Sequence, residues 1–428
     1  MGGVSRLAKR ISNTGLFDRR SYQQTYLSGS VFYPWPELHY AIIGERLGFR
    51  PNPFFDPAYY RKALAASGVT AGSSLLTFYS EQGVQRREDP SAEFNHHWYG
   101  WQNPDWVQHS VSPHPMRHML EVGLPERRDP SPRIDLRRLL AGLGREAENT
   151  PGMALAHLCR KGRMEGPGIV RDIDDLRQRQ AAFRARMNFD VLRRGRPSRP
   201  NLVFVQSRKG YRPSYLVYER NFDILRNYYA DPSGDVCPHS DHAFFQSGTK
   251  ATGIAGIMRY DPELLLAYEN VLFLDDDITL EAPAIDRLFA AMRSHNAMLA
   301  QPMLEPGSAC VWPVFKDQAN AGRIVPVNSV EVMMPAFSRE ALARLGWTFS
   351  VTISGFGMDL LWGHMLADEQ TAGRVVLVGE VQARHEKPID EVGGAFYRFM
   401  AENGINPKLE LWMVMQQYGV VPEFRAIN

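Results

Sequence analysis

The sequence predicts an α/β protein with a mainly parallel sheet covered by helices on both faces, preceded by an α-helical repeat region. Residues 200–428 alternate short apolar runs with helical stretches, which is typical of parallel sheets. Residues 1–150 carry a motif that recurs about every 40 residues, which is typical of stacked supersecondary units. Residues 151–199 form a basic linker or helix between them. We therefore expect three parts, with the last one catalytic.

The composition excludes several classes of protein. The chain has 428 residues, of which 44% are hydrophobic and 22% charged, as in ordinary soluble globular proteins. Its formal net charge of +2 argues against a nucleic-acid binder that neutralises many phosphates. The charge is uneven, at +10 over residues 1–200 and −8 over residues 201–428. We expect no nucleic-acid partner.

The cysteines and the apolar segments bear on the compartment. Cys159, Cys237 and Cys310 are far apart and form no CxxC pair, so neither a disulfide scaffold nor a zinc ribbon is expected. No run of about 18 apolar residues predicts a transmembrane helix, and residues 1–20 lack the apolar core of a signal peptide. We expect a cytoplasmic protein, and a peripheral position at the inner face of the membrane remains open.

The repeats are marked by an apolar residue followed by a capping residue. The apolar positions are 17, 55, 94 and 134, spaced 38, 39 and 40 apart. Asp or Asn follows each of them, and these residues commonly cap helices. We interpret the aromatic residues of the repeats as packing neighbouring units together. The alternative is a carbohydrate-stacking surface made of Tyr59, Tyr60, Trp98, Tyr99, Trp101 and Trp106.

The connector is basic, with twelve Lys/Arg against five Asp/Glu over residues 160–199. It includes a polar stretch, 169–192, that we expect to be helical. Such a segment is usually a solvated linker. Contact with anionic lipid headgroups or with an anionic substrate is the alternative.

The second half predicts strands and helices in alternation. The expected strands are 201–206, 215–218, 222–229, 271–274, 297–301, 330–337 and 375–381, and the expected helices are 249–268, 283–294 and 360–366. In sheets of this kind, ligands bind beyond the carboxyl ends of the strands. Functional side chains are therefore expected where the strands end.

Three carboxylates, Asp275, Asp276 and Asp277, directly follow the buried strand 271–274. Like charges repel, so a fold keeps them together when something offsets their charge, and Mg²⁺ or Mn²⁺ is the usual counter-ion. Alternation along an extended chain places Asp275 and Asp277 on one side and Asp276 on the other. The alternative is a merely structural acidic bias ahead of the next helix.

Two further residues predict catalytic or metal chemistry. Asp359 follows a Gly-Phe-Gly loop and is placed to act as a general base toward an acceptor hydroxyl. The alternative is that it caps the next helix. His385 follows the last strand and can complete a metal site begun by Asp277.

Three residues are candidates for binding the donor nucleotide. Lys250 opens the helix before the acidic strand and can meet a diphosphate as a point charge. Ser207 and Arg208 follow the first strand of the sheet. The chain has no Gly-x-Gly-x-x-Gly, Walker or Gly-x-Ser-x-Gly motif, so NAD, P-loop and serine-hydrolase chemistry are disfavoured.

From about residue 200 to 390, the chain resembles a glycosyltransferase-like domain of unknown function shared by plant and bacterial proteins. The matching pieces are Gly248-Thr-Lys250, Leu274-Asp-Asp-Asp277-Ile, the segment 330–338, Gly355-Phe-Gly-Met-Asp359 and His385. The resemblance implies a GT-A-like (Rossmann-like) fold, with Asp275 and Asp277 as its DxD motif, His385 as a late metal ligand and Asp359 as the candidate base. Residues 17–135 resemble modules that accompany bacterial capsule and surface-polysaccharide glycosyltransferases.

Residues and resemblance together predict a metal-dependent, inverting sugar transfer from a nucleotide-diphospho-sugar. Mn²⁺ or Mg²⁺ would be held by Asp277 and His385 with Asp275 nearby, and Asp275 or Asp276 would orient the donor. The acceptor would be a glycan or lipid-linked glycan of surface or capsular polysaccharide synthesis, with a membrane or assembly-complex contact. Two alternatives stay open: a nucleotidyl- or phosphotransferase using the same acidic site, and a non-catalytic binding protein of polysaccharide assembly.

Overall fold

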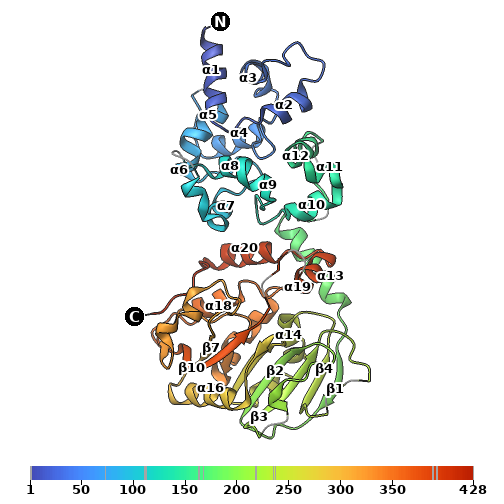
Figure 1. Cartoon of the computed structure of the whole chain (residues 1–428), viewed down its shortest axis with the longest axis vertical. Helices are drawn as coiled ribbons and strands as arrows, with labels where there is room; N and C mark the ends of the chain where they lie inside the picture. Colours follow the sequence, from blue (N-terminus) through green and yellow to red (C-terminus); the bar gives the residue numbers. More distant parts are fainter. Residues whose placement is uncertain are drawn as a thin grey trace. The chain divides into compact units, whose positions relative to one another are not determined.

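A computed structural model describes residues 2–427, apart from 73, 110–112, 162–163, 167, 217–218, 235, 237, 388–389 and 392–393. The chain divides into two compact units, unit 1 (Met1–Asp172) and unit 2 (Ile173–Asn428) (Figure 1). The division falls inside the segment expected to connect the two halves. Among the helices described, none combines the length and the apolar character needed to cross a membrane.

Unit 1 consists of short helices joined by turns (Figure 1). The helices are α1 (Gly2–Asn13), α2 (Arg19–Tyr26), α3 (Pro36–His39), α4 (Pro57–Ala66), α5 (Leu75–Phe78), α6 (Val84–Arg86), α7 (His96–Gln102), α8 (Pro115–His118), α9 (Leu124–Glu126), α10 (Leu136–Leu143), α11 (Arg145–Asn149) and α12 (Pro151–Arg160). Three one-turn π-helices continue α3, α5 and α8, at Tyr40–Gly44, Tyr79–Gly83 and Met119–Gly123.

The period of the sequence has a counterpart in the hydrogen bonds of unit 1. The residues after the repeated apolar positions begin α2, α4, α7 and α10, and each side chain accepts a hydrogen bond from the first turn of its helix. The backbone N–H of each cap donates to a carbonyl about one repeat further along. These bonds are Asp18 to Pro51 (2.9 Å), Asp56 to Pro90 (3.1 Å), Asn95 to Pro130 (3.1 Å) and Asp135 to Gly168 (2.8 Å). Each repeat is therefore tied to the next by the same bond.

Each π-turn ends at a glycine that an aromatic or thioether side chain covers. A Cβ added at Gly44 would meet the hydroxyl of Tyr22, and one added at Gly123 would meet the hydroxyl of Tyr99 and the sulfur of Met119. At Gly83 the obstacle would be the ring of Tyr79. Gly83 and Gly123 have ordinary helical φ angles of −61°. Glycine is therefore needed at these positions because it has no side chain, and not because of its backbone freedom.

The aromatic residues of the repeats mostly form the core of unit 1. Tyr60, Trp98 and Tyr99 are fully buried, and Tyr60 and Tyr99 belong to one apolar cluster with Phe55 and Phe94. These three residues therefore offer no surface on which a sugar ring could stack. Tyr59 keeps 42% of its surface exposed.

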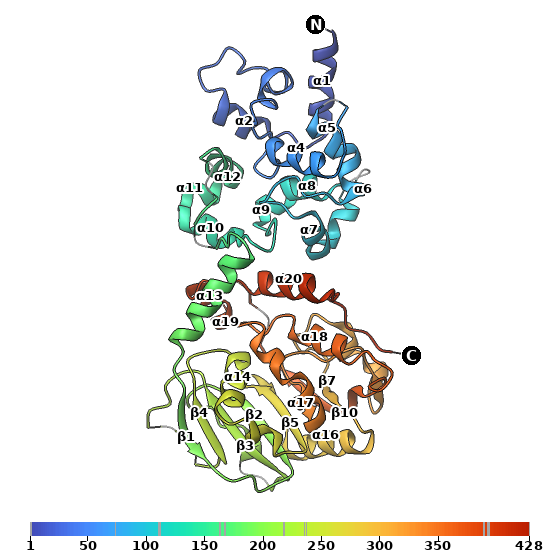
Figure 2. The ribbon, with the colours of Figure 1, turned by 180° about the vertical axis from the view of Figure 1, so that it is seen from behind.

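Unit 2 contains a sheet and the helices that cover it (Figure 2). The helices are α13 (Ile173–Arg186), α14 (Lys250–Tyr260), α15 (Pro262–Leu266), α16 (Ala282–Ser294), α17 (Arg339–Leu345), α18 (Met358–Met365), α19 (Ala395–Glu402) and α20 (Pro407–Tyr418). The strands are β1 (Asp190–Arg194), β2 (Asn201–Ser207), β3 (Phe222–Tyr228), β4 (His242–Phe245), β5 (Asn270–Asp275), β6 (Ile278–Thr279), β7 (Leu299–Leu304), β8 (Ile324–Pro326), β9 (Ala336–Ser338) and β10 (Val375–His385).

The strands pair in the order β1-β4-β3-β2-β5-β9-β7-β10-β6, and β8 pairs with β10. Strands β4, β3, β2 and β5 are parallel neighbours, as are β7 and β10. Short β9 runs antiparallel between β5 and β7, and β1, β6 and β8 are antiparallel additions. The predicted α/β class with a mostly parallel central sheet is confirmed.

Helices cover both faces of the sheet. On one face, Phe222 of β3 packs against Phe289 of α16, with 6.3 Å between ring centroids. On the opposite face, Phe273 of β5 lies 5.4 Å from Phe349, and Phe349 packs against Trp362 of α18. The burial of β2 and β5 explains their continuous apolar runs, while β3 is fully buried although it contains Asp223, Arg226 and Asn227.

Four expected elements differ in the structure. The strand expected at 215–218 is replaced, over its described part, by a 3-10 turn (Ser214–Leu216) that follows Pro213, while residues 217 and 218 lie outside the described residues. The strand expected at 330–337 is reduced to β9, since Pro335 lacks an N–H and the N–H of Glu331 donates to the side chain of Gln301. The helix expected at 249–268 breaks at Asp261, which caps α15. The helix expected at 169–192 is shorter, as α13, and β1 follows it.

Candidate active site

The acidic triplet lies where β5, in the middle of the sheet, reaches its carboxyl end. The strand is an apolar run buried between β2 and β9, and it ends at Asp275. Three different basic side chains then lie near the three carboxylates: Lys250 near Asp275, Arg208 near Asp276 and His385 near Asp277. Charge repulsion within the triplet is thus offset partly by the protein itself.

Asp275 pairs with Lys250, the first residue of α14. The Nζ of Lys250 lies 2.9 Å from Asp275 Oδ1 and also donates to the carbonyl of Met333 at 2.9 Å. The Lys250 side chain is only 10% exposed. Desolvation raises the pKa of Asp275 to about 6, although Lys250 acts against this shift. The ammonium predicted to meet a diphosphate is therefore engaged with Asp275 and a carbonyl.

Asp276 contacts a different set of residues. Its Oδ2 accepts hydrogen bonds from the backbone N–H of Arg208 (2.7 Å) and from the hydroxyl of Tyr229 (3.3 Å). The Arg208 guanidinium lies 3.1 Å from Asp276 Oδ1 and keeps 45% of its surface exposed. Arg208 thus borders solvent beside the triplet, where a ligand phosphate can reach it.

Ser207, the last residue of β2, is fully buried, and its hydroxyl accepts hydrogen bonds from the guanidinium of Arg226. Arg226 is itself 1% exposed and lies over the rings of Tyr211 and Tyr228. The Ser207 side chain is therefore part of the sheet interior. Its role toward a nucleotide stays a prediction.

His385 is brought to the triplet by strand pairing. It ends β10, and the antiparallel pairing of β10 with β6 sets His385 opposite Ile278, the residue after Asp277. Its Nδ1 lies 2.7 Å from the carbonyl of Ala309, so Nδ1 carries the proton and Nε2 faces Asp277.

The distance between His385 Nε2 and Asp277 Oδ2 is 3.7 Å, which is too long for a hydrogen bond. Contact with Asp277 raises the pKa of His385. Burial is the largest influence and acts to raise the pKa of Asp277, but His385, Lys387 and Lys250 together hold that pKa below its usual range. Two residues 108 positions apart in the sequence thus lie within ion-pair distance of each other.

Asp359 is the second residue of α18. The position before the helix is Gly357, in the left-handed region at φ 83°, so Asp359 is not the N-cap that the alternative interpretation expected. Its carboxylate accepts a hydrogen bond from the N–H of Leu360 at 3.0 Å. Burial raises its pKa to about 7. A carboxyl group with such a pKa can exchange a proton at neutral pH.

Glu331 is a candidate that the sequence interpretation did not single out. It is 8% exposed and lies 3.5 Å from the thiol of Cys310. Burial, followed by the charge of nearby Asp359, raises the pKa of Glu331 to about 7. In the sequence, Glu331 is a lone acidic residue inside an apolar segment. A strand with one solvated face explains the same pattern, so the pattern alone does not indicate a functional site.

The described residues contain no group of three or more His, Cys, Asp or Glu side chains arranged to hold a metal ion. Asp277 and His385 offer one oxygen and one nitrogen donor. The backbone carbonyl that fixes the His385 tautomer is the usual outer partner of a metal-binding histidine. Two protein donors suit Mn²⁺ or Mg²⁺, which commonly share their remaining positions between substrate phosphates and water.

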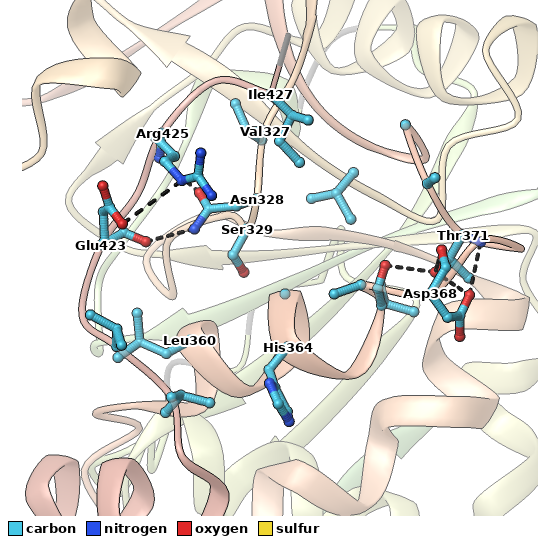
Figure 3. A pocket seen from close by; sticks show the side chains of 18 of the residues that line it. Val327, Asn328, Ser329, Leu360, His364, Asp368, Thr371, Glu423, Arg425 and Ile427 are labelled. Carbon is cyan, nitrogen blue, oxygen red and sulfur yellow. Dashed lines mark hydrogen bonds and ion pairs between the residues drawn. The ribbon is translucent and has the colours of Figure 1, made fainter.

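A cavity of about 540 Å³ lies elsewhere in unit 2, between α18 and the C-terminal segment 419–427 (Figure 3). Asn328 holds the C-terminal segment against this cavity, since its side chain donates to the carbonyl of Glu423 (2.7 Å) and accepts from the N–H of Arg425 (2.7 Å). None of the acidic triplet lines this cavity.

No known protein-family model matches the chain, and no curated protein matches its sequence. Solved structures similar to it include S. aureus TarS, at 12% identity and a TM-score of 0.28, covering 47% of this chain and 38% of that one. S. aureus TarS 1–349 in complex with UDP-GlcNAc is 10% identical, with a TM-score of 0.30, and the match covers 50% of this chain and 71% of that one. GalNAc-T7 with UDP, GalNAc and Mn²⁺ is 10% identical, with a TM-score of 0.33, and the match covers 52% of this chain and 59% of that one.

The chain therefore matches well under half of the length of the first of these proteins. The TM-scores, between 0.28 and 0.33, are low.

Proposed function

We propose that unit 2 is a metal-dependent glycosyltransferase of the GT-A type that uses a nucleotide-diphospho-sugar donor. The observation that carries the proposal is the pair Asp277 and His385, which face each other at 3.7 Å beyond the central strand, with the histidine tautomer fixed by Ala309. When bound there, Mn²⁺ or Mg²⁺ would stabilise the negative charge on the departing diphosphate.

The other side chains of the triplet would bind and orient the donor. Arg208, exposed beside Asp276, would pair with a phosphate as a bidentate cation. Lys250 would act through Asp275, by holding that carboxylate in position. Direct contact between Lys250 and the diphosphate stays a prediction beside this positioning role.

Asp359 would act as the general base. Its carboxylate would remove the proton of the acceptor hydroxyl while the acceptor oxygen bonds to the anomeric carbon and the nucleoside diphosphate leaves. A single displacement of this kind inverts the anomeric configuration. We propose a glycan or lipid-linked acceptor of bacterial surface or capsular polysaccharide synthesis, on the strength of the sequence resemblance of the repeats, and a cytoplasmic location.

The test is ligand-induced thermal stabilisation, followed by a transfer assay. The purified chain is heated with a panel of nucleotide diphosphates and nucleotide sugars, with and without Mn²⁺, beside Asp277→Ala and the control Asp174→Ala. Asp174 lies on α13 with a side chain 83% exposed. At a ligand concentration of about 100 Kd, binding stabilises a protein by about 2.7 kcal/mol, which such an assay resolves.

We expect one nucleotide to stabilise the wild type and the control only with metal, and to have no effect on Asp277→Ala. The same nucleotide sugar should then be consumed by the wild type and not by Asp277→Ala. A fully active Asp277→Ala variant would refute the metal assignment. Transfer of labelled phosphate in place of sugar would favour the nucleotidyl- or phosphotransferase alternative, and metal-independent binding without turnover would favour a binding protein.

A further inference from the structure

The connection between α2 and α3 in unit 1 exposes three large apolar side chains. Val31 is 82% exposed, Trp35 is 59% exposed and Tyr33 is 44% exposed. We call these three residues the aromatic tip. Phe32, between them, points inward, with its ring 5.3 Å from that of His39. The loop therefore separates one buried apolar side chain from three exposed ones.

The backbone of the aromatic tip is fixed by side chains of α2. The guanidinium of Arg19 donates to the carbonyl of Pro34 at 2.6 Å, and the amide of Gln23 donates to the carbonyl of Tyr33 at 2.6 Å. The backbone N–H of Trp35 donates to the carbonyl of Phe32 at 2.8 Å. Because the loop is fixed in this way, its apolar side chains are presented to solvent at little entropic cost to a binding event.

Cationic residues outnumber acidic ones in the segment that carries the aromatic tip. Residues 2–39 contain five Lys/Arg and two Asp/Glu. Asp18 caps α2, and two of the arginines are paired, Arg19 with Glu37 at 3.0 Å and Arg10 with Glu81 at 2.7 Å. The basic residues on which the proposal rests are Lys9 on α1 and Arg20 on α2. Helix α1, which carries Lys9, packs against α3, and Figures 1 and 2 show α1 and the α2–α3 connection at the same end of unit 1.

We propose that the aromatic tip and the basic residues around it bind the surface of a bilayer that contains anionic lipid. Trp and Tyr rings are stable at the boundary between headgroups and acyl chains, where an apolar ring face and a polar edge are both satisfied. The exposed Val31 enters the acyl region, and basic side chains meet the lipid phosphates. This proposal stands on unit 1 and is independent of the reaction proposed for unit 2.

The test is co-sedimentation of the full chain with vesicles of phosphatidylglycerol and phosphatidylethanolamine, compared with vesicles of phosphatidylcholine. The variant Val31→Ser/Tyr33→Ser/Trp35→Ser removes the aromatic tip, and Lys9→Ala/Arg20→Ala removes charge. Val107→Ser is the matched control, since Val107 is 54% exposed elsewhere in unit 1. Circular dichroism and thermal unfolding establish that each variant is folded.

We expect the wild type and Val107→Ser to bind the anionic vesicles, and the triple variant to bind about tenfold or more weakly. The charge variant should lose affinity for anionic vesicles only. Absence of wild-type binding, or equal binding by the triple variant, would overturn the proposal. So would a concentration-dependent self-association that the triple substitution abolishes while vesicle binding is absent, because the aromatic tip would then contact a second copy of the chain.

Discussion

Buried histidines of unit 1 and the histidine of the candidate site in unit 2 have opposite electrostatic environments. In unit 1, His39 and His96 lie 2.9 Å and 3.4 Å from a tyrosine hydroxyl, and burial lowers the pKa of both. His385 faces a carboxylate, which raises its pKa. Burial therefore favours the neutral form of the two unit 1 histidines, whereas Asp277 favours the protonated form of His385.

The two units also differ in repetition. The Tyr–His contacts of unit 1 recur in successive repeats, together with a capping residue and a covered glycine. The contacts of Asp277, Asp359 and Glu331 occur once each. Buried polar groups that repeat with the fold are explained by packing, while a cluster that occurs once, with shifted pKa values, needs a chemical explanation.

The largest effect is expected from removing the candidate base. Asp359→Asn should lower kcat of the sugar transfer by about 10² to 10⁴, since the acceptor hydroxyl loses its proton acceptor. Glu331→Gln should lower it by about tenfold, because Glu331 acts on Asp359 rather than on the acceptor. Both variants are assayed with saturating donor. If Glu331→Gln is the more damaging change, the two carboxyl groups have exchanged roles.

The pH dependence tests the same group in two ways. Burial raises the pKa of Asp359 to about 7, and a base must be ionised, so kcat should rise with pH through about 7 and then level off. Because the raised pKa disfavours the charged form in the folded state, wild-type unfolding free energy should fall relative to Asp359→Asn as pH rises from 5.5 to 8.5. The change should be on the order of 2 kcal/mol by urea unfolding. A pH-independent difference would contradict the buried environment.

A smaller effect is expected in unit 1 from filling a covered glycine. Gly44→Ala places a methyl group against the hydroxyl of Tyr22 and should cost about 1–3 kcal/mol of stability. Gly72→Ala is the control, since an added Cβ there meets nothing within 4 Å. Thermal unfolding and nucleotide binding are measured together. Only the unfolding temperature should change. Loss of nucleotide binding would show that the function of unit 2 depends on the packing of unit 1.

The smallest effect is expected from a single repeated hydrogen bond. Tyr99→Phe removes the hydroxyl that contacts Nδ1 of His118 at 2.9 Å and should cost about 1 kcal/mol. Tyr22→Phe, which removes the corresponding contact with His39, should cost a similar amount. Chemical denaturation measures both. Unequal costs would show that the two repeats are not energetically equivalent.

Local sequence patterns predicted the α/β class, because strands such as β2 and β5 are continuous apolar runs and the acidic triplet marks the end of β5. They failed where a tertiary partner decides the backbone. The strand expected at 330–337 is reduced to β9, after Pro335, and the N–H of Glu331 bonds instead to the side chain of Gln301, 30 residues away. No local pattern records that contact.

The sequence singled out the side chains that pair at the end of β5, but it did not predict which of them pair with one another. Alternation placed Asp276 apart from Asp275 and Asp277, and the structure gives Asp276 a different cation, Arg208. Lys250 was expected to meet a diphosphate, and the structure pairs it with Asp275 and the Met333 carbonyl. Glu331 was missed because Cys310 and Asp359, with which it interacts, lie in distant parts of the sequence.

The pairing of β10 with β6 also has a consequence for the order of events during folding. Asp277 emerges from the ribosome before its partner His385, which belongs to β10. The two residues meet only when β10 pairs with β6 and with β7. Contacts between such distant residues form late, since a long loop must close first. A nascent or truncated chain that lacks β10 thus has the carboxylates without the histidine. Metal binding at this site would then report that the whole sheet has been completed.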